Sequence, residues 1–261
     1  MNFVYIGYDR RETEALAVAA LSLRAQTQEN YPIRGIVLDV VREEGLYTRP
    51  TTVKHTADGP LLIDELSRRD DYDGAMSTEF AISRFLTPTL ARLKCRRKRT
   101  EPKGWALFID CDMMFRADIS ELFDILARDS EHALMCVQHD YRPKAGLKMD
   151  GQKQTAYPRK NWSSAMAFRL DHPANDALTV DVVNSWTGAD LHAFKWLPDE
   201  LIGALPPEWN YLVGEPQPKV EPKLVHYTRG GPWMNGYESA PYADEWKFWR
   251  NRWAERSALA A

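Results

Sequence analysis

Strand-like and helix-like segments alternate along the first half of this chain. Residues 3–7 and 33–41 are short apolar runs typical of buried strands, and residues 12–26 between them carry apolar side chains at helical spacing. Residues 105–109 form a third apolar run, and Asp118 begins a further helical segment. Parallel strands need crossover connections, which are usually helices. We therefore predict an α/β fold with a mostly parallel central sheet flanked by helices.

The remaining segments are less regular. Residues 42–62 lack periodicity and contain several Gly and Pro residues, so we expect a loop or lid there. A helix is expected at residues 79–93, bent near Pro88. The second half is expected to add a strand at 163–168, a helix at 173–186, a strand at 223–226 and a terminal helix at 242–256.

Composition excludes several classes of protein. The 261 residues suit one hydrophobic core, and 34 basic against 37 acidic residues create no overall positive field for nucleic acid. No apolar run approaches the ~20 residues that span a bilayer. Cys95, Cys111 and Cys136 lack the spacing of a disulfide framework or zinc knuckle. We expect a cytoplasmic protein, with peripheral association at the membrane surface as the alternative; the oligomeric state stays open.

Two carboxylates, Asp110 and Asp112, follow the apolar run 105–109 directly. Ligands of open α/β sheets bind at the carboxyl ends of the strands, and a turn after Asp110 can bring both carboxylates toward one cation. Such hard oxygen ligands suit Mg²⁺ or Mn²⁺. Acidic pairs also end many strands as turn formers or caps, so the pair alone leaves both interpretations open.

A second segment combines a histidine with two glycines. His226 ends the short apolar run 223–226, and Gly230 and Gly231 form a turn whose backbone can approach a phosphate closely. A lone histidine more often makes a structural hydrogen bond. With Asp110 and Asp112, however, His226 would complete a two-carboxylate, one-imidazole site that suits Mn²⁺.

Seven segments, in this order, resemble the retaining nucleotide-sugar glycosyltransferases related to glycogenin and the bacterial lipooligosaccharide galactosyltransferases. The resemblance runs from about residue 2 to residue 235. Each motif is modest by itself, and the series is fairly specific. The matching segments are residues 6–9, 83–88, 108–112, 162–166, 198–200, 205–210 and 226–233.

The resemblance implies a GT-A fold for residues 1–235, with residues 236–261 as an amphipathic helix packed on or appended to it. It also implies a nucleoside-diphosphate sugar as donor, usually UDP-linked, and Mn²⁺ as cofactor, with Mg²⁺ as the alternative. Asp110, Asp112 and His226 fall on the family's metal ligands.

The resemblance further assigns roles around the donor. Tyr8 and Asp9 fall near the nucleobase, Arg84 falls on the arginine that approaches the phosphates, and Asp199 and Glu200 fall beside the transferred sugar. The implied catalytic residues are thus Asp199, Glu200 and Arg84. The implied donor site comprises Tyr8, Asp9, Arg84, Asp110, Cys111, Asp112, Ser163, Gly230 and Gly231.

Three departures from the family pattern leave the donor and the stereochemistry open. Residues 163–165 read Ser-Ser-Ala where the family has Asn, Ser or Ala, and Gly. Glu200 stands where glutamine is expected, and it is either a nucleophile or a solvated loop residue. The motif after His226 is one residue shorter and lacks its lysine, so Arg229 would be a displaced substitute.

The sequence therefore predicts a metal-dependent hexosyltransferase, and the resemblance alone implies retention of configuration. A haloacid-dehalogenase-type phosphohydrolase is excluded for two reasons. That family has its Asp-x-Asp motif near the N-terminus, followed by Gly and Thr or Val. Here the motif lies at residues 110–112, and Met113 and Met114 follow it. A non-catalytic nucleotide-sugar-binding module remains the alternative. The acceptor stays open among a glycan, a protein, a small molecule and a modified nucleic acid.

Two further patterns lie outside these motifs. Residues 94–103 hold six basic side chains, which suit either a solvated loop or a grip on a phosphorylated acceptor. Trp246, Trp249 and Trp253 recur at helical spacing, and we expect this stripe to pack onto the catalytic domain. Membrane-surface association or an acceptor platform is the second interpretation of the stripe.

Overall fold

The computed structural model of the protein describes residues 1–56, 59–140 and 159–260. Its helices and strands are, in chain order, β1 (Phe3–Gly7), α1 (Thr13–Gln26), β2 (Ile33–Ile36), α2 (Leu38–Glu43), β3 (Thr51–Thr56), β4 (Gly59–Asp64), α3 (Thr87–Lys98), β5 (Trp105–Ile109), β6 (Met113–Phe115), α4 (Ser120–Arg128), β7 (Leu134–Cys136), β8 (Ala165–Arg169), α5 (Val180–Ser185), α6 (Gly188–His192), β9 (Ile202–Ala204), β10 (Tyr211–Leu212), β11 (Leu224–His226) and α7 (Ala243–Ala260).

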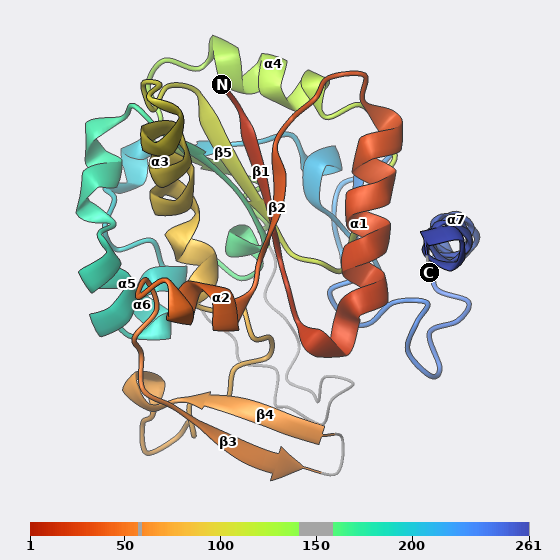
Figure 1. Cartoon of the computed structure of the whole chain (residues 1–261), viewed down its shortest axis with the longest axis horizontal. Coiled ribbons are helices and arrows are strands. Elements are labelled where there is room, and N and C mark those ends of the chain that lie inside the picture. Colours follow the sequence, from red (N-terminus) through yellow and green to blue (C-terminus); the bar gives the residue numbers. More distant parts are fainter. Residues whose placement is uncertain (57–58, 141–158, 261) are drawn as a thin grey trace.

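A central sheet has the strand order β2-β1-β5-β8-β7-β9. β1 is parallel to both β2 and β5, β9 is parallel to β7, and β8 is antiparallel to its neighbours. β1 and β5 are buried at every position, which explains their continuous apolar runs. Helices α1 and α3 lie on opposite sides of these strands (Figure 1). The predicted α/β fold with a mostly parallel sheet is confirmed.

The register of β1 and β5 places two predicted site segments at one edge of the sheet. Ile6 pairs with Ile109, so both strands end at the same level. The residues after β1, Tyr8 and Asp9, therefore lie at the same edge as Asp110, which follows β5. This is the edge at which open α/β sheets bind ligands.

A smaller sheet supports the same edge. After Asp110 the chain turns, and β6 pairs with β11 rather than continuing the central sheet. β11 in turn pairs with β10 in parallel. β6 and β11 are buried throughout, because one face packs against the main core and the other against α1 and Trp246 of α7.

Two predictions for residues 33–62 are wrong. The strand predicted for 33–41 ends at Ile36, and α2 follows, because Leu38 and Val41 are buried at helical spacing. The loop predicted for 42–62 contains the β3–β4 hairpin, seen below the sheet in Figure 1. Most of β3 is exposed, so the hairpin lacks the apolar alternation that marks a half-buried strand.

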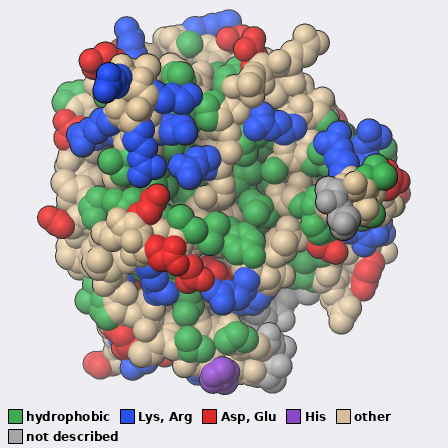
Figure 2. All heavy atoms as spheres, in the orientation of Figure 1, with side chains coloured by type: hydrophobic (Ala, Val, Ile, Leu, Met, Phe, Trp, Pro, Cys, Tyr) green, Lys and Arg blue, Asp and Glu red, His purple; other side chains and the backbone are tan. Residues whose placement is uncertain are grey.

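Pro88 lies in the first turn of α3, where proline is tolerated, rather than at a bend within a longer helix. The basic run at 94–103 begins in the last turns of the same helix, which ends at Arg99 in the left-handed conformation. Lys and Arg side chains gather over α3 in Figure 2. Cations at a helix C-terminus are favoured by the helix dipole, which accounts for part of this run.

The terminal helix α7 lies beside α1 (Figure 1). Trp246 is 1% exposed and packs in a small apolar cluster with Val18, Met114 and Tyr227. Its ring stacks on Trp233, with centroids 5.1 Å apart. Within the described residues, no helix combines the length and apolar character needed to cross a bilayer.

Candidate active site

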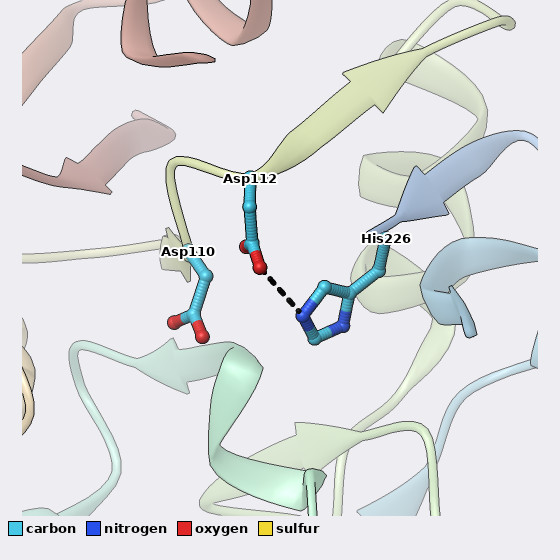
Figure 3. A group of neighbouring side chains, drawn as sticks. All are labelled: Asp110, Asp112 and His226. Carbon is cyan, nitrogen blue, oxygen red and sulfur yellow. Dashed lines mark ion pairs between the residues drawn. The ribbon is translucent and has the colours of Figure 1, made fainter. Parts of the chain in front are cut away.

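Asp110 and Asp112 lie on either side of the turn that connects β5 to β6. The backbone N–H of Asp110 donates to the carbonyl of Ser164 at 2.9 Å, which fixes the turn against the segment before β8. Asp112 immediately precedes β6. The change of sheet between β5 and β6 therefore brings both carboxylates to one side of the turn (Figure 3).

His226 joins these carboxylates through the pairing of β6 with β11. His226 is paired with Met113, and the N–H of Tyr227 donates to the carbonyl of Asp112 at 3.0 Å. Nε2 of His226 lies 3.4 Å from Oδ2 of Asp112 (Figure 3). Ligand atoms of Asp110, Asp112 and His226 all lie within 4.8 Å of one another. One ion can therefore contact all three residues.

The hydrogen bonds around His226 favour a ligand role for Nε2. Nδ1 lies 2.9 Å from Oδ1 of Asn210, whose amide nitrogen donates to Oγ of Ser164 at 2.9 Å. This network assigns the Asn210 oxygen as acceptor, so Nδ1 carries a proton and Nε2 is the ring nitrogen that faces Asp112. Such an outer hydrogen bond is the usual way a protein orients a metal-binding imidazole.

Asp112 carries a second sign of a ligand site. Its Oδ1 is buried and accepts no hydrogen bond within the described residues. Burial raises the pKa of Asp112, but His226 and Arg84 outweigh that effect and lower it overall. An ionised carboxylate with a buried, unsatisfied oxygen is costly unless a ligand or ion contacts it. Two carboxylates and one imidazole fit Mn²⁺ or Mg²⁺.

Arg84 lies beside this cluster, in the 3-10 turn Ser83–Leu86. Its Nη1 lies 2.8 Å from both Oδ1 of Asp110 and the carbonyl of Ser163. The guanidinium carbon lies 5.1 Å from the ring centroids of both Phe80 and Phe108. These contacts hold a buried cation in a fixed position next to Asp110.

The carboxylate oxygens of Asp9, by contrast, are fully hydrogen-bonded to other groups of the protein. Its carboxylate accepts hydrogen bonds from the backbone N–H and side chain of Arg11 and from the backbone N–H of Glu79. Burial raises the pKa of Asp9, but the hydrogen bonds and charge of Arg11 lower it overall. Tyr8 is half-buried, with its hydroxyl 3.3 Å from Oγ1 of Thr13. The Asp9 side chain thus anchors the segment after β1.

Cys111 and Ser163 also bond within the protein. The thiol of Cys111 donates to Oε2 of Glu12 at 3.1 Å, and burial raises its pKa well above the usual value. Burial, together with the charge of Asp112, raises the pKa of Glu12 to about 8. Oγ of Ser163 lies 2.7 Å from Nδ1 of His192. Cys111 therefore remains a neutral thiol that is hydrogen-bonded to Glu12.

Steric constraints favour glycine at positions 230 and 231, in the turn after β11. Gly230 has a φ of 138°, which is strained for other residues. A Cβ on Gly231 would lie 1.9 Å from the ring of Trp233. Arg229 forms a two-point ion pair with Glu215, at 2.6 and 2.9 Å. The turn is thereby packed against the aromatic cluster that holds α7.

The predicted sugar-side residues, Asp199 and Glu200, are exposed in the 3-10 turn Asp199–Leu201. Asp199 forms an ion pair with Arg159. Within the described residues, neither carboxylate belongs to the group formed by Asp110, Asp112 and His226.

Three side chains near the cluster carry no sequence-based prediction of a role. Asn210 orients His226, and Lys160 is a buried cation in the field of Asp110 and Arg84. His139 lies near His226; burial and that neighbour lower the pKa of His139 to about 4, so its imidazole is neutral. Asn210 lies within residues 205–210, a segment that carries the family resemblance, so the sequence could have indicated a role for it. A lone Lys or His in a polar segment gives no such indication.

Comparison with known proteins adds a family and a fold. The chain is 42% identical to Protein CDI from Arabidopsis thaliana over 248 residues, which are 93% of this chain and 83% of that protein. A scan against protein-family models finds no match.

Solved structures extend the comparison at low sequence identity. The WbbM bifunctional glycosyltransferase superposes with a TM-score of 0.59 at 14% identity, over 95% of this chain and 49% of that one. The chain thus spans about half the length of WbbM. Galactosyltransferase LgtC, in complex with donor and acceptor sugar analogues, superposes with a TM-score of 0.52 at 12% identity, over 97% and 96% of the two chains.

The central sheet and the carboxylates at its edge thus lie in a known architecture. The chain belongs to the family of Protein CDI and has the GT-A-like fold of the glycosyltransferases.

Proposed function

We propose that this protein is a metal-dependent glycosyltransferase that moves a hexose from a nucleoside-diphosphate sugar, UDP-linked, to an acceptor with retention of configuration. One observation carries the proposal: Asp110, Asp112 and His226 converge within 4.8 Å at the ligand-binding edge of a GT-A-like fold. The LgtC structure, described as a complex with donor and acceptor sugar analogues, supports a two-substrate reaction for this fold.

Mn²⁺, or Mg²⁺ in its place, would be held by Asp110, Asp112 and His226 and would neutralise charge on the departing diphosphate. The chain prepares this site in two ways. Asp110 and Asp112 supply fixed negative charge, and Asn210 keeps Nε2 of His226 directed at Asp112. Because these orientations exist beforehand, little reorganisation accompanies binding.

Arg84 is proposed to bind the phosphates of the donor. Its guanidinium is held by Asp110 and the Ser163 carbonyl, and its Nε–H is buried without a hydrogen-bond partner in the described parts of the chain. A phosphate oxygen would satisfy this donor. As negative charge accumulates on the leaving group, a fixed arginine stabilises it more than a mobile one would.

The remaining donor contacts are proposed from the family resemblance, and Tyr8, Asp9 and Ser163 also lie at the same edge of the sheet as Asp110. We assign Tyr8 and the backbone of Asp9 to the nucleobase, since the Asp9 side chain is already saturated. Ser163 and the glycines at 230 and 231 are assigned to the sugar diphosphate. Glu200 is the proposed sugar-side carboxylate, because within the described residues it forms no ion pair, whereas Asp199 is held by Arg159. A carboxylate there would stabilise an oxocarbenium-like sugar.

The test is release of nucleoside diphosphate from a panel of nucleotide sugars in the presence of Mn²⁺, Mg²⁺ or a chelator. We expect metal-dependent release that is lost in Asp112→Ala and retained in Asp71→Ala, a matched change at an exposed carboxylate. The anomeric configuration of the product, read by NMR, tests retention. Donor binding without turnover would favour a non-catalytic binding module, and the absence of both binding and turnover would contradict the proposal.

A further inference from the structure

The end of α3 concentrates positive charge in a chain whose net charge is negative. Residues 94–103 hold six basic side chains and one acidic one, whereas the whole chain has 34 basic and 37 acidic residues. Five of the six basic side chains are exposed, and the sixth is partly exposed. The α3 basic patch, as we call this group, consists of Lys94, Arg96, Arg97, Lys98, Arg99 and Lys103.

Neighbouring acids leave this charge unbalanced. Among the residues that the structure describes, one ion pair reaches the patch, between Arg97 and Glu44 at 3.8 Å. Arg99 ends α3 with a φ of 54°, a left-handed conformation that favours glycine or asparagine, yet an arginine occupies it. Like charges packed so closely repel one another, and a polyanionic partner relieves that repulsion.

The patch lies at the edge of the central sheet opposite the candidate active site. The carbonyl of Lys103 accepts a hydrogen bond from the amino group of Met1, and β5 begins at Trp105. Asp110 follows the other end of β5, and a five-residue strand spans about 17 Å. A small anion at the patch therefore cannot also contact a cation on Asp110, so the patch is a surface for a separate partner.

A second region of exposed basic and apolar side chains lies on α7. The helix is fixed near its beginning, where Trp246 is 1% exposed, whereas residues 254–259 are all exposed. Residues 247–259 hold four basic side chains and one acidic one. Phe248 is 50% exposed and Leu259 90% exposed, and the guanidinium of Arg252 lies 5.5 Å from the ring centroid of Phe248. Phe248 and Leu259 are about three helical turns apart, so they lie on the same side of α7.

The two regions together fit the surface of an anionic lipid bilayer. Figure 2 shows Lys and Arg side chains over α3 and beside α7 on the same face of the molecule. A flat, extended surface can contact both regions at once, and basic segments gain free energy next to anionic headgroups. Apolar side chains flanked by arginine suit the boundary between headgroups and acyl chains. A nucleic acid would match the charge, but it offers no apolar region to Leu259.

We propose that this face of the protein binds the surface of an anionic phospholipid bilayer. The α3 basic patch contacts the charged headgroups, and Phe248 and Leu259 of α7 insert between them. Membrane binding of this kind does not depend on the transferase activity proposed above, so either can fail without the other.

Sedimentation of the whole chain with vesicles tests the proposal. The wild type should bind vesicles made of equal parts of phosphatidylcholine and phosphatidylserine, should not bind phosphatidylcholine alone, and should be released at about 0.5 M NaCl. Arg96→Gln, Lys98→Gln and Arg99→Asn in one chain should weaken binding ~100-fold, because each basic residue near an anionic surface contributes separately. All three positions are exposed, and asparagine tolerates the left-handed conformation at 99, so the variant should unfold at the same denaturant concentration as the wild type.

A matched variant separates local charge from total charge. Lys54→Gln, Arg68→Gln and Arg69→Gln remove the same three charges from exposed residues in and beside the β3–β4 hairpin, and binding should stay within ~3-fold of the wild type. Phe248→Ser with Leu259→Ser should weaken binding ~10-fold. Val53→Ser, at an apolar residue that is 54% exposed on β3, should not weaken it.

Three outcomes would overturn the proposal. The first is that the wild type does not bind phosphatidylserine vesicles. The second is that the two triple variants lose affinity equally, which would make the effect one of net charge. The third is tighter binding of the wild type to a DNA duplex than to the vesicles at the same salt concentration, which would assign the patch to nucleic acid. Wild-type affinity in Phe248→Ser with Leu259→Ser would overturn the part assigned to α7.

Discussion

Asp9 and Asp112 lie near the carboxyl ends of neighbouring strands, β1 and β5, yet their carboxylates have opposite surroundings. Each oxygen of Asp9 accepts two hydrogen bonds from the protein. Asp112 has one oxygen beside His226 and one that is buried without a partner in the described residues. The same residue type at the same sheet edge thus anchors the fold in one case and remains available to a ligand in the other.

The difference shows how hydrogen-bond saturation separates structural from functional acids. A carboxylate offers about four lone-pair sites, and Asp9 uses all of them internally. Asp112 leaves sites open at a cost in stability, a pattern common where a protein is arranged for binding rather than for stability. The following predictions test this contrast, from the largest expected effect to the smallest.

Asp112→Asn should lower Mn²⁺ affinity by ~1,000-fold, about 4 kcal/mol, because it removes a charged ligand of the ion and not merely an outer hydrogen bond. The metal-free protein should lose less than about 1 kcal/mol of unfolding free energy, because the change removes a buried, unsatisfied charge. Electron paramagnetic resonance of Mn²⁺ and chemical denaturation measure the two quantities. Unchanged affinity together with a large loss of stability would make Asp112 a structural acid.

Asp9→Asn should do the reverse. It should lower the unfolding free energy by about 3 kcal/mol at pH 7, because the amide NH2 group cannot accept the two hydrogen bonds that now reach one of the carboxylate oxygens. The pKa of Asp9 is lowered in the folded state, so its contribution is present above the unfolded value and is lost as the pH falls through the folded one. The difference from the wild type, followed by denaturation, should shrink as the pH falls below the ordinary aspartate pKa of about 3.9.

A matched control for that change is Asp39→Asn, at a carboxylate that is 61% exposed. It should alter stability by less than about 0.5 kcal/mol. If Asp9→Asn lowers the free energy of Mn²⁺ binding by more than it lowers the free energy of unfolding, hydrogen-bond saturation does not distinguish Asp9 from Asp112.

Asn210→Ala should weaken Mn²⁺ binding by ~10- to 50-fold, in the range for loss of an outer hydrogen bond, because Nδ1 of His226 loses its acceptor. Nitrogen NMR of the imidazole should show a mixture of tautomers in place of one. Asn251→Ala, on the exposed part of α7, serves as the control. A single tautomer and wild-type affinity in Asn210→Ala would remove the positioning role.

Glu12→Gln should have the smallest effect, less than ~3-fold on Mn²⁺ affinity at pH 6.5. The pKa of Glu12 is raised to about 8, chiefly by burial, so the carboxyl is already protonated in the metal-free protein at that pH. At pH 8.5 the wild type gains a negative charge near Asp112 and should bind the cation more tightly than the variant. Glu14→Gln, exposed on α1, should show no such divergence between the two pH values.

The success of the fold prediction depended on burial. β1 and β5 are buried on both faces and were found from their apolar runs. β3 is mostly exposed and is held by pairing with β4, so local composition did not reveal it. The end of β2 was misplaced because Leu38 and Val41 fit either a strand or a helix by hydrophobicity alone.

The features of the candidate site also separate into those that the sequence predicted and those that depend on the tertiary structure. The sequence by itself determined which side chains have metal-ligand chemistry, and it placed Asp110 after a buried strand and His226 beside a glycine turn. Only the tertiary structure decided that β6 pairs with β11, that Asn210 orients His226, and that Lys160 is buried beside two acids. Those facts depend on contacts between segments distant in sequence, and hydrogen-bond saturation is a property of such contacts, not of residue type.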